Sequence, residues 1–196
     1  MQCSVLDEKK IGQIHRTSIG ILETVGIIIP HKEMRGLFKA AGAAVDDQAE
    51  LVKIPEKLVM SCLGTAVKKF KLFGRDLSKS AVFGEGKRNY NATSGEALWI
   101  VDKTGERRYT TIEDVRAGTR LGNALPDLTI AGAMADPKDI PTSYRCVEVA
   151  AEMLKNTTKP ITFWFHDRAS AKFVIDLFTA VRGSLEEVAK YPFAYP

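Results

Sequence analysis

The sequence predicts an α/β protein in which an N-terminal helical cap with a small two-strand element precedes about half of a (β/α)8 TIM barrel. Helical periodicity dominates residues 1–80, whereas short apolar runs alternate with amphipathic stretches from residue 81 onward. The second pattern is typical of repeated βα units in a parallel sheet. Three such strands and part of a fourth make about half of the eight strands that close a barrel. We therefore predict a cap over residues 1–80 and an incomplete barrel over residues 81–196.

Helical spacing and apolar alternation define the elements of the predicted cap. In chain order they are a helix from Glu8 to about Gly26, a helix from about Lys32 to Ala41, a strand over Leu51–Ile54, a helix from Pro55 to about Val67, and a strand over Phe70–Phe73. Pro30 stops the first helix, since proline lacks the backbone donor that a helix needs. Gly42 follows the second helix at the position where a left-handed residue is favoured.

The region after residue 80 is predicted to alternate strands with helices. Its elements are a strand around Arg88–Ala92, a hairpin of Ala97–Val101 with Arg107–Tyr109, a helix over Thr111–Leu125, a strand over Leu128–Ala133, a helix over Thr142–Leu154, a strand over Ile161–Phe165, helices over Ala169–Val181 and Leu185–Lys190, and a strand over Phe193–Tyr195. Asp114 lies three residues after Thr111, which indicates a capping box. Parallel strands need neighbours on both sides, so we expect the complete protein to be longer.

Composition argues against several classes of function. The formal charge of +4 arises from 28 basic and 24 acidic residues spread along the chain, so no basic stripe for nucleic acid is predicted. No signal peptide and no apolar run long enough to span a membrane occurs. Cys3, Cys62 and Cys146 lack metal-ligand spacing, so we expect no metal site and a reduced, cytoplasmic protein. Nucleotide-binding glycine motifs and nucleophile motifs are absent from the sequence.

Several segments in a fixed order carry a resemblance to a known family. They are Ile14–Ile27, Leu37–Asp46, Val52–Pro55, Phe70–Asp76, Asp102–Arg108 followed by Thr111–Asp114, and Leu125–Asp127. The most specific is the stretch from Asp102 to Arg108 with the helix start that follows it. Across nearly all 196 residues, the chain resembles the N-terminal part of the trimethylamine methyltransferase, or MttB-like, family.

The resemblance implies a corrinoid-dependent methyltransferase. A methylated amine, either trimethylamine or a betaine-like quaternary amine, would give its methyl group to the cobalamin-type corrinoid of a separate partner protein. The chain itself would bind no cofactor, and a homo-oligomer is compatible with this reading. The protein would mainly orient a cation and exclude water, and an aromatic and carboxylate pocket suits that task because ring faces attract quaternary ammonium groups.

Candidate site residues follow from their position at the ends of the predicted strands, where barrel enzymes place their catalytic groups. His166 and Asp136 are the catalytic candidates. The substrate-binding candidates are Thr93, Ser94, Gly95, Met134, Phe165, Asp167 and Tyr195. Asp136 and Asp167 could supply negative charge for a cationic substrate. Asp136 before Pro137 is also an ordinary turn residue, and Asp167 is better placed to cap the next helix.

Other interpretations of the same residues stay open. His166 could bond only to a loop backbone, and Thr93, Ser94 and Gly95 could serve only the turn. Trp164 and Phe165 must point to opposite faces of their strand, so at most one can join an aromatic cage. The fold alone would also suit a lyase or a hydrolase. A third alternative is a non-catalytic fragment that binds a partner through an exposed sheet edge.

Overall fold

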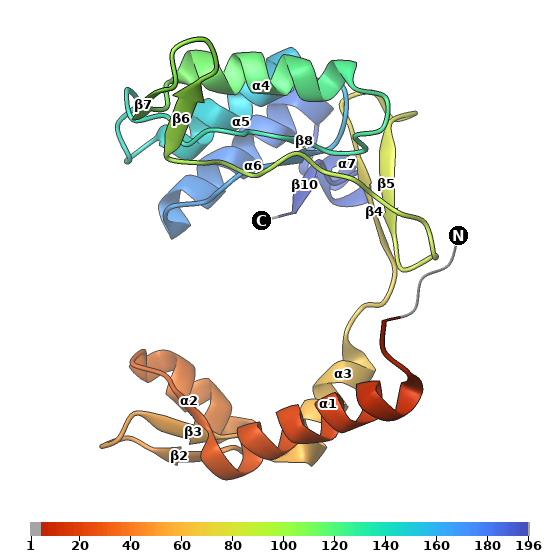
Figure 1. Cartoon of the computed structure of the whole chain (residues 1–196), viewed down its shortest axis with the longest axis vertical. Coiled ribbons are helices and arrows are strands. Elements are labelled where there is room, and N and C mark those ends of the chain that lie inside the picture. The colour runs from red at the N-terminus through yellow and green to blue at the C-terminus, as the bar shows by residue number, and fades with distance from the viewer. Residues whose placement is uncertain (1–4, 196) are drawn as a thin grey trace. The chain divides into compact units, whose positions relative to one another are not determined.

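A computed structural model describes residues 5–195, which divide into two compact units between Val67 and Lys68 (Figure 1). The division falls at residue 67, whereas the sequence places it at residue 80. The reason is a hairpin that straddles residue 80, in which β4 (Phe70–Phe73) pairs with β5 (Ser80–Phe83). Cys3 lies outside the described residues. No helix within residues 5–195 is long and apolar enough to span a membrane.

The first unit contains four helical segments around a small sheet. Its elements are α1 (Glu8–Gly20), the π-helical segment η1 (Ile21–Val25), β1 (Ile27–Ile28), α2 (Lys32–Ala40), β2 (Ala44–Asp46), β3 (Leu51–Lys53) and α3 (Glu56–Thr65). The helix expected up to Gly26 is present, although its last turn is a π-helix. Gly42 adopts a φ of 100°, which confirms the predicted left-handed residue after α2. Pro55 caps α3 from outside the helix instead of occupying its first turn.

The sheet of the first unit has three antiparallel strands in the order β1-β3-β2. Val52, at the centre of β3, is fully buried and forms a core with Ala43 and Ile54. The two strands expected in the cap are both present, but they do not pair with each other as a two-strand element. The Leu51–Lys53 strand pairs instead with β1 and β2, which have only two and three residues and so leave no readable alternation.

The second unit combines two hairpins with a parallel sheet and four helices. After the β4–β5 hairpin its elements are β6 (Leu98–Val101), β7 (Glu106–Tyr109), α4 (Ile112–Ala124), β8 (Ala131–Gly132), α5 (Arg145–Asn156), β9 (Ile161–Thr162), α6 (Arg168–Arg182), α7 (Leu185–Lys190) and β10 (Ala194–Tyr195). Thr111 and Asp114 form the predicted capping box at the start of α4. The helix expected from Thr142 begins three residues later, at Arg145.

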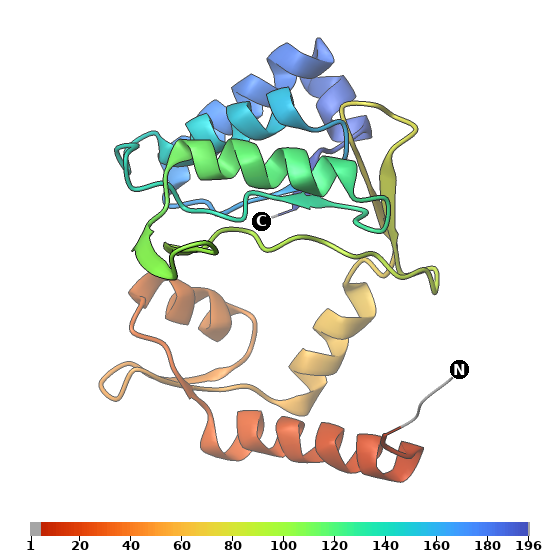
Figure 2. The same ribbon diagram turned by 45° about the horizontal axis from the view of Figure 1, so that its top comes forward.

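The parallel strands follow one another in chain order, β8-β9-β10, and a single parallel bridge joins Asn91 to Ile130 beside β8. Helices α4, α5 and α6 lie on one side of these strands (Figures 1 and 2). Phe163, Val174 and Phe193 belong to the buried core between the sheet and the helices. A parallel sheet in sequential order, with its crossover helices on one side, is the arrangement that βα repeats produce.

The first strand of the predicted barrel, Arg88–Ala92, is reduced to that single bridge. The backbone after it passes so close to β8 that a Cβ atom at Gly132 would collide with the carbonyl oxygens of Ala92 and Thr93. This close crossing replaces a regular ladder, and only glycine permits it. The bonds that remain include Ala92 N to Ile130 O at 3.2 Å and Met134 N to Thr93 O at 3.1 Å.

Candidate functional site

Asp136 and His166 meet because β8 and β9 run in parallel and in register. Gly132 of β8 is the register partner of Thr162 of β9. Asp136 lies four residues after Gly132, and His166 lies four residues after Thr162. The carboxyl ends of parallel strands reach the same edge of a sheet, so the two side chains come together there. His166 Nε2 lies 3.0 Å from Asp136 Oδ1.

The second oxygen of the Asp136 carboxylate binds two cations. Arg145 Nη1 donates to Oδ2 at 3.1 Å, and Lys138 Nζ lies 3.4 Å from the same oxygen. The side chains of Asp136 and Arg145 are 11% and 8% exposed, whereas that of Lys138 is 42% exposed. The cluster therefore contains one carboxylate that is shared by two basic side chains.

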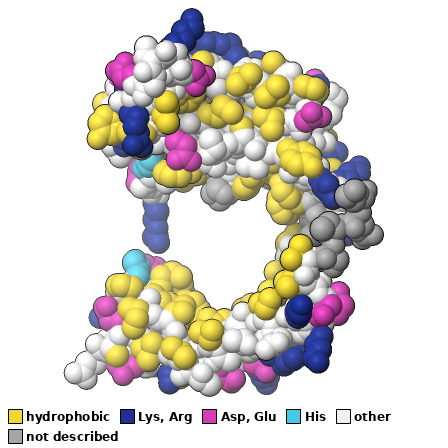
Figure 3. All heavy atoms as spheres, in the orientation of Figure 1, with side chains coloured by type: hydrophobic (Ala, Val, Ile, Leu, Met, Phe, Trp, Pro, Cys, Tyr) yellow, Lys and Arg dark blue, Asp and Glu magenta, His cyan; other side chains and the backbone are white. Residues whose placement is uncertain are grey.

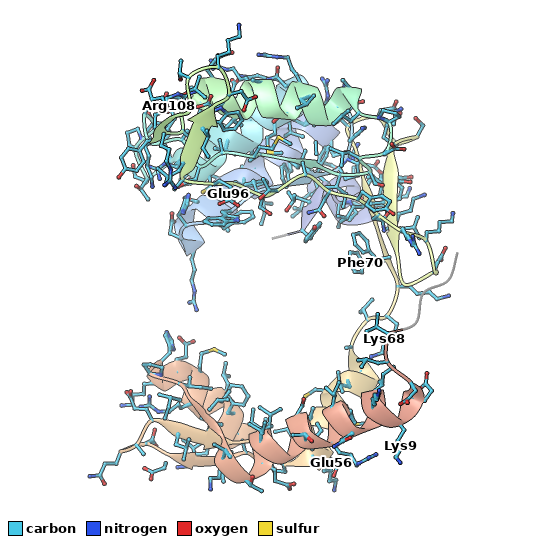
Figure 4. All side chains as sticks on the ribbon, in the orientation of Figure 1. Lys9, Glu56, Lys68, Phe70, Glu96 and Arg108 are labelled. Carbon is cyan, nitrogen blue, oxygen red and sulfur yellow. The ribbon has the colours of Figure 1, made fainter. Side chains whose placement is uncertain are left out.

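The backbone of Asp136 is also fixed. Asp136 N donates to Glu96 O at 2.9 Å, and the hydroxyl of the fully buried Thr110 donates to Asp136 O at 2.6 Å. Figure 4 labels Glu96 on the segment that leads into β6. Residues next to both ends of the β6–β7 hairpin thus bind the loop after β8. These bonds fix the backbone that carries the Asp136 carboxylate.

A narrow cavity lies between this cluster and the segment after Asn91. Ser94, Gly95, Trp164, Asp136 and His166 are among its lining residues. Its volume is about 10 Å³, which is room for about one water molecule. A Cβ atom at position 95 would lie 3.2 Å from Ala135 O, so glycine allows the close approach of this segment.

The strand expected over Ile161–Phe165 ends at Thr162, so Trp164 and Phe165 lie just beyond β9, and their side chains occupy different surroundings. Phe165 packs against the helix-facing core, where its ring centroid lies 4.9 Å from that of Phe163. Trp164 lines the cavity and is 53% exposed. Between the two, Trp164 is the ring available to a ligand beside His166.

Of the nine predicted site residues, the structure brings together Ser94, Gly95, Asp136 and His166. Thr93 lies at the rim, exposed, and its hydroxyl donates to Glu96 Oε1 at 3.1 Å. Ser94 Oγ lies 3.3 Å from the hydroxyl of Thr162, so the serine also ties its segment to β9.

Four predicted site residues lie away from this cavity. Met134 has a φ of 59° and rests its side chain on Gly118 of α4, where an added Cβ would lie 2.9 Å from the Met134 sulfur. Phe165 belongs to the core described above. Tyr195 packs edge-on against Phe83 of β5, with ring centroids 5.9 Å apart.

Asp167, the fourth of these residues, caps α6. Its carboxylate accepts from Ser170 N at 2.8 Å and from the Ser170 hydroxyl at 2.6 Å. The hydroxyl bond lowers the pKa of Asp167 below its ordinary value, and the backbone bond adds to this effect. The alternative of helix capping is therefore what the structure shows for this residue.

Arg145 and Thr110 belong to the site but are not among the residues predicted from the sequence. A signal for Arg145 did exist, because it is the first residue of α5. A cation there opposes the helix dipole, and a partner carboxylate nearby is the usual remedy. For Thr110, which directly follows a strand and precedes a capping residue, the sequence carries no comparable signal.

Comparison with known proteins decides the family. The profile of a family described as trimethylamine methyltransferase (MTTB) matches residues 1–195. The chain belongs to the trimethylamine methyltransferase family. Membership supports a methyltransferase, and the matched part of the relatives is their N-terminal part.

Individual members of the family show moderate identity. The chain is 30% identical over 186 residues to trimethylamine methyltransferase MttB of Desulfitobacterium hafniense strain DSM 10664 / DCB-2, which is 94% of this chain and 37% of that protein. It is 25% identical over 190 residues to glycine betaine methyltransferase of strain Y51, which is 96% of this chain and 39% of that protein. With trimethylamine methyltransferase MttB1 of Methanosarcina mazei it shares 30% identity over 115 residues, 59% of this chain and 23% of that protein. The chain thus spans well under half the length of these relatives.

Proposed function

We propose that this chain forms the first part of an enzyme that moves a methyl group from a methylated amine to the corrinoid cofactor of a partner protein. The relatives named for trimethylamine and for glycine betaine support the amine substrate. We also propose that the sequential parallel sheet is the first half of an eight-stranded barrel, that the protein acts in the cytoplasm, and that it can form a homo-oligomer. The observation that carries the proposal is the bond between His166 and Asp136 beside Trp164, at the carboxyl ends of adjacent parallel strands.

In this proposal the exposed ring of Trp164 faces the methylated nitrogen. A ring face attracts a quaternary ammonium group by about 0.5 to 2 kcal/mol. His166 and Ser94 supply polar contacts from the other side of the cavity, and Gly95 lets a ligand approach the backbone. Asp136 fixes His166, since its own charge is already balanced by Arg145 and Lys138.

The proposal assigns the corrinoid to a separate protein. Bound on its own protein, a corrinoid supplies a nucleophilic cobalt centre that accepts the methyl group from nitrogen. The residues of this chain would orient the amine for that transfer and keep water away from it.

The test uses the natural gene product that contains this chain, supplied with a reduced corrinoid protein and with trimethylamine or glycine betaine. Mass spectrometry of the demethylated amine measures transfer. We expect transfer with one of the two amines, a loss of about 10-fold or more in the Trp164→Ala variant, and no loss in His15→Ala, an exposed histidine of α1. Absence of transfer from any methylated amine would contradict the proposal.

A non-catalytic role is the second candidate. It is favoured by the size of the cavity, which at about 10 Å³ holds no amine as it stands. In that case the chain would bind a partner protein through its sheet edge. Copurification of a stable partner by a gene product with no transfer activity would support this alternative.

A further inference from the structure

We propose that Arg145 is a positioning residue that fixes the orientation and the tautomer of His166 by holding the carboxylate of Asp136. This inference rests on the proposed function in one respect, because it takes His166 as the group that faces the substrate. The orientation and the tautomer of the His166 imidazole can be measured without any assay of activity.

Arg145 is itself held in one place. It is the first residue of α5, its side chain is 8% exposed, and its Nε donates to Ile140 O at 2.9 Å. With Nε held in this way, the planar guanidinium reaches Asp136 through Nη1, which donates to Oδ2 at 3.1 Å. Because this planar group is anchored at two points, Ile140 O and Asp136 Oδ2, it can orient the carboxylate that it binds.

Helix stability does not explain a buried arginine at this position. The amino-terminal end of a helix carries partial positive charge, and a cation there is unfavourable. Removing an arginine and its partner from water is also costly. The arginine is therefore better explained by what it does to Asp136 than by what it adds to α5.

The orientation of Asp136 decides the state of His166. Since Arg145 binds Oδ2, the other oxygen, Oδ1, faces His166 Nε2 at 3.0 Å. An ionised carboxylate only accepts hydrogen bonds, so Nε2 must carry a proton. In the neutral ring, Nδ1 is then the acceptor, and it makes no hydrogen bond to any described residue. The ring therefore offers a defined acceptor to a ligand.

Lys138 provides an internal comparison. Its ammonium lies 3.4 Å from the same oxygen of Asp136, but the side chain is 42% exposed and carries no fork. We expect it to add positive charge near Asp136 without fixing the direction of the carboxylate, because an ammonium on a flexible stem is a point charge. If Arg145 acts by orienting the carboxylate, its replacement will change the tautomer of His166 and the replacement of Lys138 will not, although both side chains are cations beside the same oxygen.

The first experiment reads the tautomer directly. The natural gene product is prepared with 15N-labelled histidine, the His166 signals are assigned with a His166→Asn variant, and the ring nitrogen that carries the proton is identified by NMR. We expect the Nε2–H form in the unmodified protein and a mixture of tautomers in Arg145→Met. Lys138→Met should keep the Nε2–H form. Arg116→Met, which breaks a 2.6 Å pair with Glu152 between α4 and α5, should keep it as well.

Two results would overturn the inference. One is an Nδ1–H form in the unmodified protein, which can be observed even if Arg145→Met does not fold. The other is an unchanged tautomer in a folded Arg145→Met protein. Arg145→Lys provides a milder variant, which should retain more of the Nε2–H form than Arg145→Met.

Kinetics then separates this inference from the proposed function. We expect Arg145→Met to lower kcat by about 100-fold, because a misplaced group costs about that much, and Arg145→Lys to recover part of the loss. Arg116→Met, whose pair with Glu152 lies between α4 and α5, should change kcat much less. If the unmodified protein transfers no methyl group but the tautomer shifts as expected, the proposed function fails and the positioning role stands. If transfer occurs and the tautomer does not depend on Arg145, the positioning role fails alone.

Discussion

Replacement of Asp114 by asparagine tests how the second unit is held together at the start of α4. Asp114 Oδ2 accepts from Thr111 N at 2.8 Å and from Arg108 Nη1 at 2.7 Å, while Oδ1 accepts from Arg108 Nη2 at 2.8 Å. The carboxylate therefore joins the β6–β7 hairpin to the first turn of the helix. Figure 4 labels Arg108 on this hairpin. Asparagine at position 114 keeps the shape of the aspartate side chain and removes its charge.

The magnitude follows from the pKa of this carboxyl group. The Arg108 guanidinium lowers the pKa of Asp114 from 3.8 to about 2, and the Thr111 bonds contribute to the same effect. A difference of this size is equivalent to about 2.5 kcal/mol. Because the Arg108 side chain is 35% exposed, solvent screening reduces the expected loss to about 1 to 2 kcal/mol. Figure 3 shows basic and acidic side chains at the surface of this unit, where such screening acts.

The assay is urea unfolding of the gene product and its Asp114→Asn variant as pH is lowered. The folded pKa lies below the unfolded one, so the stabilisation is complete above about pH 4 and disappears as pH falls through about 2. The difference in free energy of unfolding between the two proteins should shrink over that range. Asp102→Asn, an exposed aspartate in the turn of the same hairpin, is the control. A difference that stays constant down to pH 2 would refute the reasoning.

Three further predictions concern packing and accessibility. Gly132→Ala should destabilise the protein by about 3 kcal/mol in urea unfolding, because the new methyl group overlaps the crossing backbone; an unchanged midpoint would contradict the close approach. Phe163→Ala should cost about 3 to 5 kcal/mol, since the ring is 1% exposed in the main core, and a loss below about 1 kcal/mol would count against that core. A thiol reagent followed by mass spectrometry should label the exposed Cys62 well before Cys146, which is 1% exposed; the reverse order would be inconsistent with the fold.

The helices of this chain could be predicted from the sequence because local signals define them. The capping pair of Thr111 and Asp114 marks the start of α4, and the Gly42 position marks the end of α2. The strands that escaped prediction, β1, β2 and β5, have two to four residues. Their pairing depends on residues distant in the sequence, and a run this short carries no periodic pattern of its own. The same limit explains why the sequence does not predict β1 and β2 as the partners of the strand over Leu51–Lys53.

The part of the candidate site that lies at the ends of strands could be predicted from the sequence. Asp136 and His166 follow adjacent parallel strands at equal distances, so their meeting required only the register of β8 and β9. The direction of each side chain was not determined in this way. Met134 turns onto α4 because its backbone adopts a left-handed conformation, and a non-glycine residue gives no warning of that in the sequence. Tyr195 belongs to the core with Phe83, a contact that depends on the unpredicted strand β5.

The charges around Asp136 change the expected basis of amine recognition. Asp136 is predicted as a catalytic candidate that could also supply negative charge for a cationic substrate. Arg145 and Lys138 already share that carboxylate, so the cluster is net positive even without a charge on His166. Such a cluster repels a cation, so the attraction in the proposed site must come from elsewhere. The exposed ring of Trp164 can supply it, since a ring face binds a methylated ammonium group without a carboxylate. The positive cluster would then act on whatever the amine carries besides its methyl groups. A carboxylate on the substrate would be drawn toward Arg145, Lys138 and His166, whereas trimethylamine has no group that could use them.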